Sequence, residues 1–335
     1  MKNKFFLLVL SCLLLSSCIL FFKDTKGSSS DYPLIVKYNM DLGDMGEGSG
    51  WQSILEEIAE KRKYVCIDLT ECTMIGTEFN PNKISSDHKY YIVKIAFPDT
   101  VEKIADGSQS DPTFKGMFYL DFFMGKGLAE IGDYAFYEFN SLNMSSLPAG
   151  LTYIGDYAFS GCRNLSIKAL PKGINHIGTR AFEKCGNISL NSLPAEITTI
   201  RTGTFEECSK ISKMSIPNGV TVIGNFAFNK CSNLSQVTLP ETLTDIGNEA
   251  FNYTNLTQIS LPESITGIYS KAFFNCTKMN LIICKAAVPP LLSPNAIPYN
   301  WLLDEKFQIK VPAGSVNTYK KNKDWQSFSD VISAL

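Results

Sequence analysis

The sequence predicts an α/β solenoid, a rod of stacked coils in which short parallel strands line up along one face. Three observations support this prediction. Segments that begin with isoleucine recur every 23 residues, each segment repeats the same apolar positions, and a proline follows each strand-like stretch. A lone segment cannot fold, because ordering it costs more free energy than its own core returns. Neighbouring segments must therefore stack on one another.

Seven consecutive copies define the repeat, and the sixth is one residue short. The copies begin at Ile131, Ile154, Ile177, Ile200, Ile223, Ile246 and Ile268. Two of them read IGDYAFSGCRNLSIKALPKGINH, from Ile154, and IGNFAFNKCSNLSQVTLPETLTD, from Ile223. The sixth copy has Tyr253-Thr254 in place of its cysteine, and we expect it to tighten one coil without interrupting the stack.

Each copy contains a stretch with the alternation of a half-buried strand. From Leu234 to Leu239, apolar residues alternate with Gln236 and Thr238, and Pro240 then ends the ladder. The phase of this alternation changes along the chain. Copies four to six place Met214, Val237 and Ile259 at one inward position, whereas the first three copies place Met144, Ile167 and Leu190 one residue earlier. A slip of one residue reverses the face that a side chain takes, so we expect strand geometry to change between coils three and four.

The residues after each starting isoleucine predict one helical turn per coil. The third position holds residues that favour helix N-caps, namely Asp133, Asp156, Thr179, Thr202, Asn225, Asn248 and Ser270. A phenylalanine then follows in every copy and is expected to point into the core: Phe136, Phe159, Phe182, Phe205, Phe228, Phe251 and Phe273.

Five cysteines share one position of the repeat: Cys162, Cys185, Cys208, Cys231 and Cys276. Many cysteines in an exported chain often indicate disulfides. A ladder in one structural position instead favours small, buried apolar side chains. Zinc is also disfavoured, because ligands stacked in a row do not converge on one ion.

The N-terminus has the anatomy of a targeting segment. Lys2 and Lys4 precede the apolar run Phe5–Leu15, so residues 1–17 are expected to form a signal peptide. The run ends in Leu-Ser-Ser-Cys, which resembles a bacterial lipobox with Cys18 as the lipid-attachment residue. An uncleaved membrane anchor is the alternative, because Ile19–Phe22 extends the apolar run. Both interpretations tether the repeats to a membrane, and residues 18–50 are expected to form the lipidated N-terminus and a spacer.

The rest of the chain divides around the repeats. Residues 51–74 are expected to form an N-terminal cap, with a helix over Trp51–Lys63 and a strand over Tyr64–Leu69. Diverged repeats with insertions are expected over 75–130, and the seven regular repeats over 131–288. A C-terminal cap is expected over 289–335, where Tyr319, Trp325 and Phe328 can seal the last coil.

The pattern IGxxAFxxC…L…LPxxLTx and the ending VPAGSVNTYK…W resemble the BspA-like class of bacterial leucine-rich repeats. The helix followed by YVCIDL is similar to the N-terminal cap of that family. The resemblance implies a leucine-rich-repeat solenoid on a surface lipoprotein or secreted protein. Members of the class are implicated in adhesion to host matrix proteins or to other microbes, and the resemblance identifies no ligand.

Composition and motifs argue against several other classes of function. A net charge of −2 provides no broad basic surface for nucleic acid. His88 lies in an insertion, His176 is expected to be an exposed turn residue, and neither a nucleophile elbow nor a phosphate-binding loop occurs. We therefore expect no enzymatic activity, cofactor or metal. A polysaccharide lyase with a parallel β-helix is the specific enzymatic alternative, but it needs acidic and basic groups clustered across adjacent strands.

The candidate ligand-binding surface is the outward side of the strands: Lys213, Ser215, Gln236, Thr238, Gln258 and Ser260. We expect a monomer that binds an extracellular protein there, either a host matrix protein or a microbial surface component. Aromatic residues dominate binding hot spots, and these strands have none. Aromatic contacts are therefore expected from Phe114–Phe123 or from Tyr299 and Trp301. A passive spacer or surface coat is the alternative.

Overall fold

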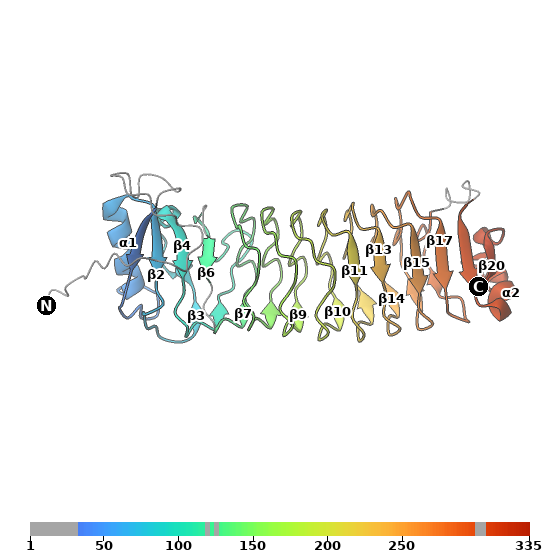
Figure 1. Cartoon of the computed structure of the whole chain (residues 1–335), viewed down its shortest axis with the longest axis horizontal. Helices are drawn as coiled ribbons and strands as arrows, with labels where there is room; N and C mark the ends of the chain where they lie inside the picture. Colours follow the sequence, from blue (N-terminus) through green and yellow to red (C-terminus); the bar gives the residue numbers. More distant parts are fainter. Residues whose placement is uncertain (1–32, 118–120, 124–126, 299–305) are drawn as a thin grey trace.

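The computed structural model describes residues 33–117, 121–123, 127–298 and 306–335. Over these residues the chain winds into one elongated stack of coils, with the two caps at opposite ends (Figure 1). All the strand pairings described are parallel. The predicted solenoid is therefore confirmed. The expected signal peptide and the expected lipid-attachment residue Cys18 lie outside the described residues.

The N-terminal cap combines a helix with a small parallel sheet. Helix α1 (Gly50–Lys61) begins at Ser49, whose side chain accepts the Gln52 N–H, and it buries Trp51, Ile54, Leu55 and Ile58. The sheet has the order β1-β2-β4-β6, formed by Leu34–Lys37, Val65–Asp68, Ile92–Ala96 and Asp121–Phe123. Strand β1 pairs with β2 although it lies within residues 18–50, so the spacer expected there ends before Leu34. Two 3-10 helices, η1 (Pro81–Lys83) and η2 (Asp87–Tyr91), also lie in this region.

A row of two-residue strands runs along one edge of the rod and is termed the short-strand row. Its first sheet contains β3 (Glu78–Phe79), β5 (Lys103–Ile104), β7 (Glu130–Ile131), β8 (Tyr153–Ile154) and β9 (His176–Ile177). Its second contains β10 (Thr199–Ile200), β12 (Val222–Ile223), β14 (Asp245–Ile246), β16 (Gly267–Ile268) and β18 (Leu291–Leu292). The short-strand row therefore begins upstream of Ile131, at β3 and β5.

Longer strands form a second row, termed the strand face, from the fourth coil onward. They are β11 (Lys213–Ser215), β13 (Gln236–Thr238), β15 (Gln258–Leu261), β17 (Leu281–Cys284), β19 (Gln308–Val311) and β20 (Ile332–Ala334). In coil three the buried residues of this stretch are Leu190 and Leu193, with two exposed residues between them. In coil four they are Met214 and Ile216, with one exposed residue between them. The predicted change in strand geometry between these coils is confirmed.

A ladder of phenylalanine rings forms the centre of the rod. Rings in successive coils stack at centroid distances of 4.8 to 5.8 Å and within 14° of parallel, from Phe114 through to Phe273. The short sixth coil does not interrupt this ladder. Thr254 fills its cysteine position and lies 3.1 Å from the sulfur of Cys276. Phe114 is buried at the start of the ladder, so the expectation of an exposed aromatic contact is wrong for this residue.

The predicted helical turn in each coil is wrong, because the segment forms a series of tight turns instead. Positive φ angles recur at two positions per coil, which are mostly not glycine, for example 55° at Tyr157 and 58° at Lys184. Such residues interrupt a right-handed helix. The Tyr157 N–H donates to the Thr179 C=O of the next coil at 2.8 Å, where a helix would bond within the coil. These bonds between coils offset the cost of the left-handed conformations.

The predicted N-cap residues also bond between coils. Asp133 Oδ1 accepts the backbone N–H of Asp156 at 2.7 Å, and Asp156 Oδ1 accepts that of Thr179 at 2.7 Å. Asn225 and Asn248 do the same for the coils that follow them. The side chain at this position thus accepts a backbone N–H, as a helix cap would, but the N–H belongs to the next coil and not to its own coil.

The repeated cysteines are buried and unpaired, as predicted. Each sulfur donates to the carbonyl oxygen of the phenylalanine in the preceding coil at 3.0 to 3.1 Å, for example Cys208 to Phe182. Burial raises the pKa of the thiol at Cys162, Cys185, Cys208 and Cys231, and raises that of Cys276 to about 11.

The five thiols are expected to resist alkylation at pH 8 in the folded protein and to react fully in guanidinium chloride. Both burial and a raised pKa suppress the reactive thiolate. The folded state raises the thiol pKa above the ordinary value of 9.0 and so favours the protonated thiol. The resulting contribution to the stability of the fold is complete below pH 9 and declines as the pH rises above 9, where the unfolded chain loses its thiol protons. Peptide mapping by mass spectrometry measures the labelling. Rapid labelling of Cys208 in the folded state would contradict its buried position.

The short-strand row is interrupted between β9 and β10, and the interruption coincides with Arg201. Other coils have glycine here, such as Gly178, where an added Cβ would lie 2.4 Å from the Asp156 nitrogen. A residue with a side chain therefore needs the backbone to lie farther from the preceding coil. Tyr269 occupies the same position after the shortened coil, and its N–H bond to the Ile246 C=O is kept.

Replacing Arg201 with glycine is expected to close this gap and to stabilise the protein by about 1 kcal/mol. Two backbone hydrogen bonds restored between β9 and β10 should add about 2 kcal/mol to the free energy of unfolding. The greater flexibility of glycine in the unfolded chain should subtract about 1 kcal/mol. Thermal unfolding measures the change, with Thr199→Gly as a matched control that is expected to lower the melting temperature. A melting temperature for R201G at or below that of the wild type would show that Arg201 does not cause the gap.

The C-terminal cap closes the other end of the core. It contains η4 (Ala313–Ser315), α2 (Val316–Lys321) and η5 (Gln326–Phe328) between strands β19 and β20. The rings of Tyr319, Trp325 and Phe328 are buried, as expected. Trp325 Nε1 donates to the Pro290 C=O and the Tyr319 hydroxyl donates to the Ala286 C=O, both at 2.8 Å, which ties the cap to the end of the repeats.

Candidate interaction surface

The strand face brings the six predicted ligand-binding residues together on adjacent coils. All six side chains are exposed. Lys213 is in register with Gln236, and Ser215 with Thr238, whereas Gln258 and Ser260 lie on β15. Strands β11, β13 and β15 lie side by side along the rod (Figure 1). β15 belongs to a separate sheet from β13, and it follows the segment where the sixth copy lacks a residue.

The six side chains on this face have no hydrogen-bonding partner within the described part of the protein. Across the described ranges of the chain, they form neither hydrogen bonds nor ion pairs with other side chains or with the backbone. A polar side chain without an internal partner keeps its hydrogen-bonding capacity for a ligand. The strand face can therefore bind a polar surface without first breaking interactions within the rod.

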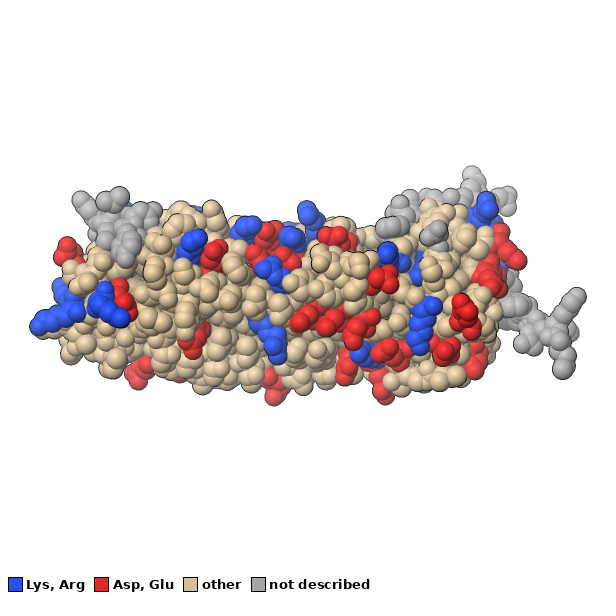
Figure 2. All heavy atoms as spheres, turned by 180° about the vertical axis from the view of Figure 1, so that it is seen from behind, with Lys and Arg blue, Asp and Glu red and all other residues tan. Residues whose placement is uncertain are grey.

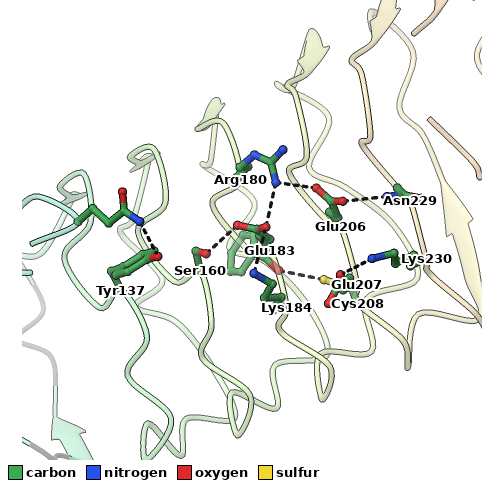
Figure 3. A network of polar contacts seen from close by, with 12 residues as sticks. Tyr137, Ser160, Arg180, Glu183, Lys184, Glu206, Glu207, Cys208, Asn229 and Lys230 are labelled. Atoms are coloured by element: carbon green, nitrogen blue, oxygen red, sulfur yellow. Dashed lines mark hydrogen bonds and ion pairs between the residues drawn. The ribbon is translucent and has the colours of Figure 1, made fainter. Parts of the chain in front are cut away.

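The turn face, formed by the third to ninth residues of each coil, is organised differently. Its centre holds an interlinked group of charges, shown in Figure 3. Arg180 donates to Glu183 at 2.9 Å and to Glu206 of the next coil at 2.7 Å. Burial on its own would lower the pKa of Arg180, but Glu206 and Glu183 raise it above its ordinary value. These charges bond to one another across coils three and four, where the short-strand row is interrupted.

Further contacts extend this group along the rod. Ser160 donates to Glu183 at 3.0 Å, and Asn229 donates to Glu206 at 2.8 Å. Lys230 pairs with Glu207 at 2.8 Å near the solvent. The charged groups at the centre of the turn face already have partners, and the buried Asn229 Oδ1 is the exception among its polar atoms. This centre therefore supports the fold rather than offering free binding groups.

Aromatic side chains that the strand face lacks occur on the turn face instead. Tyr134 and Tyr157 stack at 4.7 Å, and Tyr137 lies beside them. This row is not among the expected aromatic contacts, which were Phe114–Phe123, Tyr299 and Trp301. Its signal was the recurrence of tyrosine at the fourth repeat position of two successive copies. Tyr299 and Trp301 lie outside the described residues.

Charge on the visible surface is mixed. Figure 2 shows lysine and arginine interspersed with aspartate and glutamate in small groups, with wide uncharged areas between them. This distribution agrees with the low net charge of the sequence. An extended basic surface of the kind that binds nucleic acid is not seen on this side.

Three features would indicate a catalytic or membrane protein: an exposed histidine, a metal-binding cluster and a membrane-spanning helix. His176 is half-buried on strand β9 and stacks on Tyr153 at 4.3 Å, so it is not the exposed turn residue expected. Among the described residues, no three metal-binding side chains cluster together, and no helix has the length and apolar character to cross a bilayer.

A family model gives the decisive comparison. The model described as the BspA type leucine rich repeat region matches in six copies, over residues 82–212 and 198–290. The chain belongs to the BspA-type leucine-rich repeat family. No curated protein matches this BspA-type chain significantly.

Solved structures similar to this BspA-type protein come from several bacteria. A leucine-rich repeat protein from Bacteroides ovatus is 20% identical, with 66% of this chain and 70% of that chain covered and a TM-score of 0.47. A leucine rich cell surface protein from Faecalibacterium prausnitzii is 26% identical, and the match covers 59% of this chain but 49% of that protein, with a TM-score of 0.42. The pneumococcal vaccine antigen PcpA is 16% identical, with 78% and 84% covered and a TM-score of 0.34.

Proposed function

We propose that this protein is an adhesin that binds an extracellular protein through its strand face while a lipid on Cys18 holds it at the bacterial cell surface. The ligand is a host matrix protein or a protein on another microbial cell. One observation carries the proposal: six exposed polar side chains on adjacent coils have no internal partners. The turn face differs, because its central charges bond to one another.

Membership of the BspA-type family supports a binding role, and the name of the Faecalibacterium relative places that relative at the cell surface. A solenoid also suits adhesion, since its stacked coils present a long, continuous surface. The six candidate residues of the strand face comprise one lysine and otherwise neutral donors and acceptors. It therefore suits hydrogen bonding to a protein surface, and it lacks the paired acid and base that a lyase needs.

Binding of the purified rod to fibronectin, fibrinogen and laminin, measured by surface plasmon resonance, tests the strand face. The variant Q236A/T238A/Q258A is expected to weaken any interaction about tenfold or more. The matched control T198A/T221A/T266A changes three exposed residues outside the strand face and is expected to bind like the wild type. Equal binding by both variants and the wild type would exclude the strand face.

Mass analysis of the mature N-terminus tests the tether independently. The proposal predicts a protein that begins at Cys18 with diacylglycerol attached, and a Cys18→Ser variant that leaves the membrane fraction. An intact Met1 in the membrane fraction would instead support an uncleaved anchor. A lipidated protein that binds none of the matrix proteins and no neighbouring cells would support a passive surface coat.

A further inference from the structure

Two aromatic stacks flank a pair of carboxylates near the N-terminal end of the repeats. Tyr134 and Tyr157 form one stack, with centroids 4.7 Å apart and planes within 8°. Tyr153 and His176 form the other, at 4.3 Å and 11°. Asp156 lies between Tyr153 and Tyr157 along the chain, Asp133 directly precedes Tyr134, and all six side chains are partly accessible to solvent. We term these six residues the Tyr-Asp patch.

The members of the Tyr-Asp patch are close enough to affect one another electrostatically. Burial raises the pKa of Tyr153, and the charges of Asp133 and Asp156 raise it further. At Tyr134, burial and the neighbouring tyrosines raise the pKa, and the same two carboxylates add to the effect. Residues from coils one and two therefore form one surface.

The structural role of the two aspartates does not require their charge. Asp133 Oδ1 accepts the Asp156 N–H at 2.7 Å, and in coils five and six Asn225 Oδ1 accepts the Asn248 N–H at the same distance. Asparagine therefore makes the same bond without a negative charge. Two carboxylates on adjacent coils repel each other, which is a cost that asparagine avoids.

Among the described residues no cation forms an ion pair with these two carboxylates, although the charge of Arg201 reaches the patch and acts to lower the pKa of Tyr153 and of His176. The Arg180 guanidinium bonds to Glu183 and Glu206, and Lys103 pairs with Glu78 and Asp106. Asp133 and Asp156 form no ion pair within the described residues, and each uses Oδ1 for its backbone bond. The second oxygen of each carboxylate is thus available to an external donor.

We propose that the Tyr-Asp patch is a second interaction surface, which binds an arginine-bearing extended segment of a partner protein. A guanidinium group can donate to two oxygens at once, and carboxylates one coil apart offer a pair of acceptors. The tyrosine hydroxyl groups supply further acceptors, and planar guanidinium groups pack well against aromatic rings. In coils four to seven the aspartate position holds neutral residues only, so the surface is confined to the first coils.

Binding of a fluorescent eight-residue peptide of alternating arginine and serine, measured by anisotropy in EDTA at low salt, tests this surface. EDTA removes metal ions that could bridge the carboxylates. The variant D133N/D156N keeps both backbone bonds and removes both charges. It is expected to weaken binding about tenfold or more, and to melt at the same temperature as the wild type or higher. The control E60Q/E263Q removes two charges from distant exposed sites and is expected to bind normally.

Each alternative result overturns the inference. Wild-type protein that binds the peptide no better than a citrulline counterpart would show that the patch does not select a cation. If E60Q/E263Q weakened peptide binding as much as D133N/D156N does, the binding would depend on the overall charge of the protein and not on the patch. A lower melting temperature for D133N/D156N would mean that the two charges stabilise the fold. The strand-face variant Q236A/T238A/Q258A is expected to bind the peptide normally, which separates this surface from the proposed adhesive face.

Discussion

Replacing Phe182 with alanine is expected to lower the free energy of unfolding by about 3–5 kcal/mol, the usual cost of truncating a buried phenylalanine. Its ring is fully buried and stacks on Phe159 at 5.4 Å and on Phe205 at 5.8 Å. In a solenoid each coil is stabilised by its two neighbours, so a cavity in coil three also weakens coils two and four. Urea unfolding followed by circular dichroism measures the loss.

Phe226→Ala is the matched control, because it removes the same side chain from a half-exposed position on the turn face. It is expected to cost about 1 kcal/mol, since little apolar area is returned to water. The unfolding of F182A is also expected to broaden, because loss of coupling between halves of a repeat array reduces cooperativity. Equal losses in the two variants would contradict a continuous aromatic core.

Replacing Arg180 with alanine is expected to cost about 2–3 kcal/mol, because it leaves the largely buried Glu206 without a cation and Glu183 with only the longer, 3.6 Å ion pair to Lys184. The side chains of Glu183 and Glu206 are 12% and 11% exposed, and Arg180 is their shared partner. The loss also removes a bond between coils three and four, where the short-strand row is already open. Thermal and urea unfolding measure the change.

Lys230→Ala is the control for this variant. Its 2.8 Å ion pair with Glu207 has similar geometry, but the lysine side chain is 52% exposed, so the expected cost is at most about 1 kcal/mol. Adding E183Q and E206Q to R180A is expected to recover most of the stability, because the unpaired charges are then gone. Failure of this triple variant to recover would show that packing of the arginine, rather than its charge, stabilises the junction.

Most of the architecture could be predicted because the repeat constrains it strongly. A period of 23 residues with phenylalanine in every copy implies a stacked core, and the shifted position of Leu190 relative to Met214 implies the change in strand geometry. The caps were predictable from local signals, since Ile54, Leu55 and Ile58 have helical spacing. The stacked core, the change in strand geometry and the caps can all be inferred from sequence spacing alone, without knowing any contact between particular residues.

The turns and the surfaces could not be predicted with the same success. Residues with positive φ such as Tyr157 and Arg180 have no glycine or asparagine signal, so their turns read as a helix. The bond from Asp133 reaches the next coil, and a cap within the coil explains the same residue type equally well. Strand β1 was missed because Leu34–Lys37 is short and separated from the repeats. The Tyr-Asp patch depends on side chains from coils one and two, which are brought together only by the stacking.

Distances between spin labels test the stacked-coil architecture most directly. Asn143, Thr257 and Asn280 occupy one exposed position in coils one, six and seven. Parallel strands lie about 4.8 Å apart, so pulsed electron resonance should give about 24 Å between Asn143 and Thr257 and about 29 Å between Asn143 and Asn280. The buried native cysteines should not be labelled. Equal distances for the two pairs, or a shorter distance for the second, would contradict a rod built from one coil per repeat.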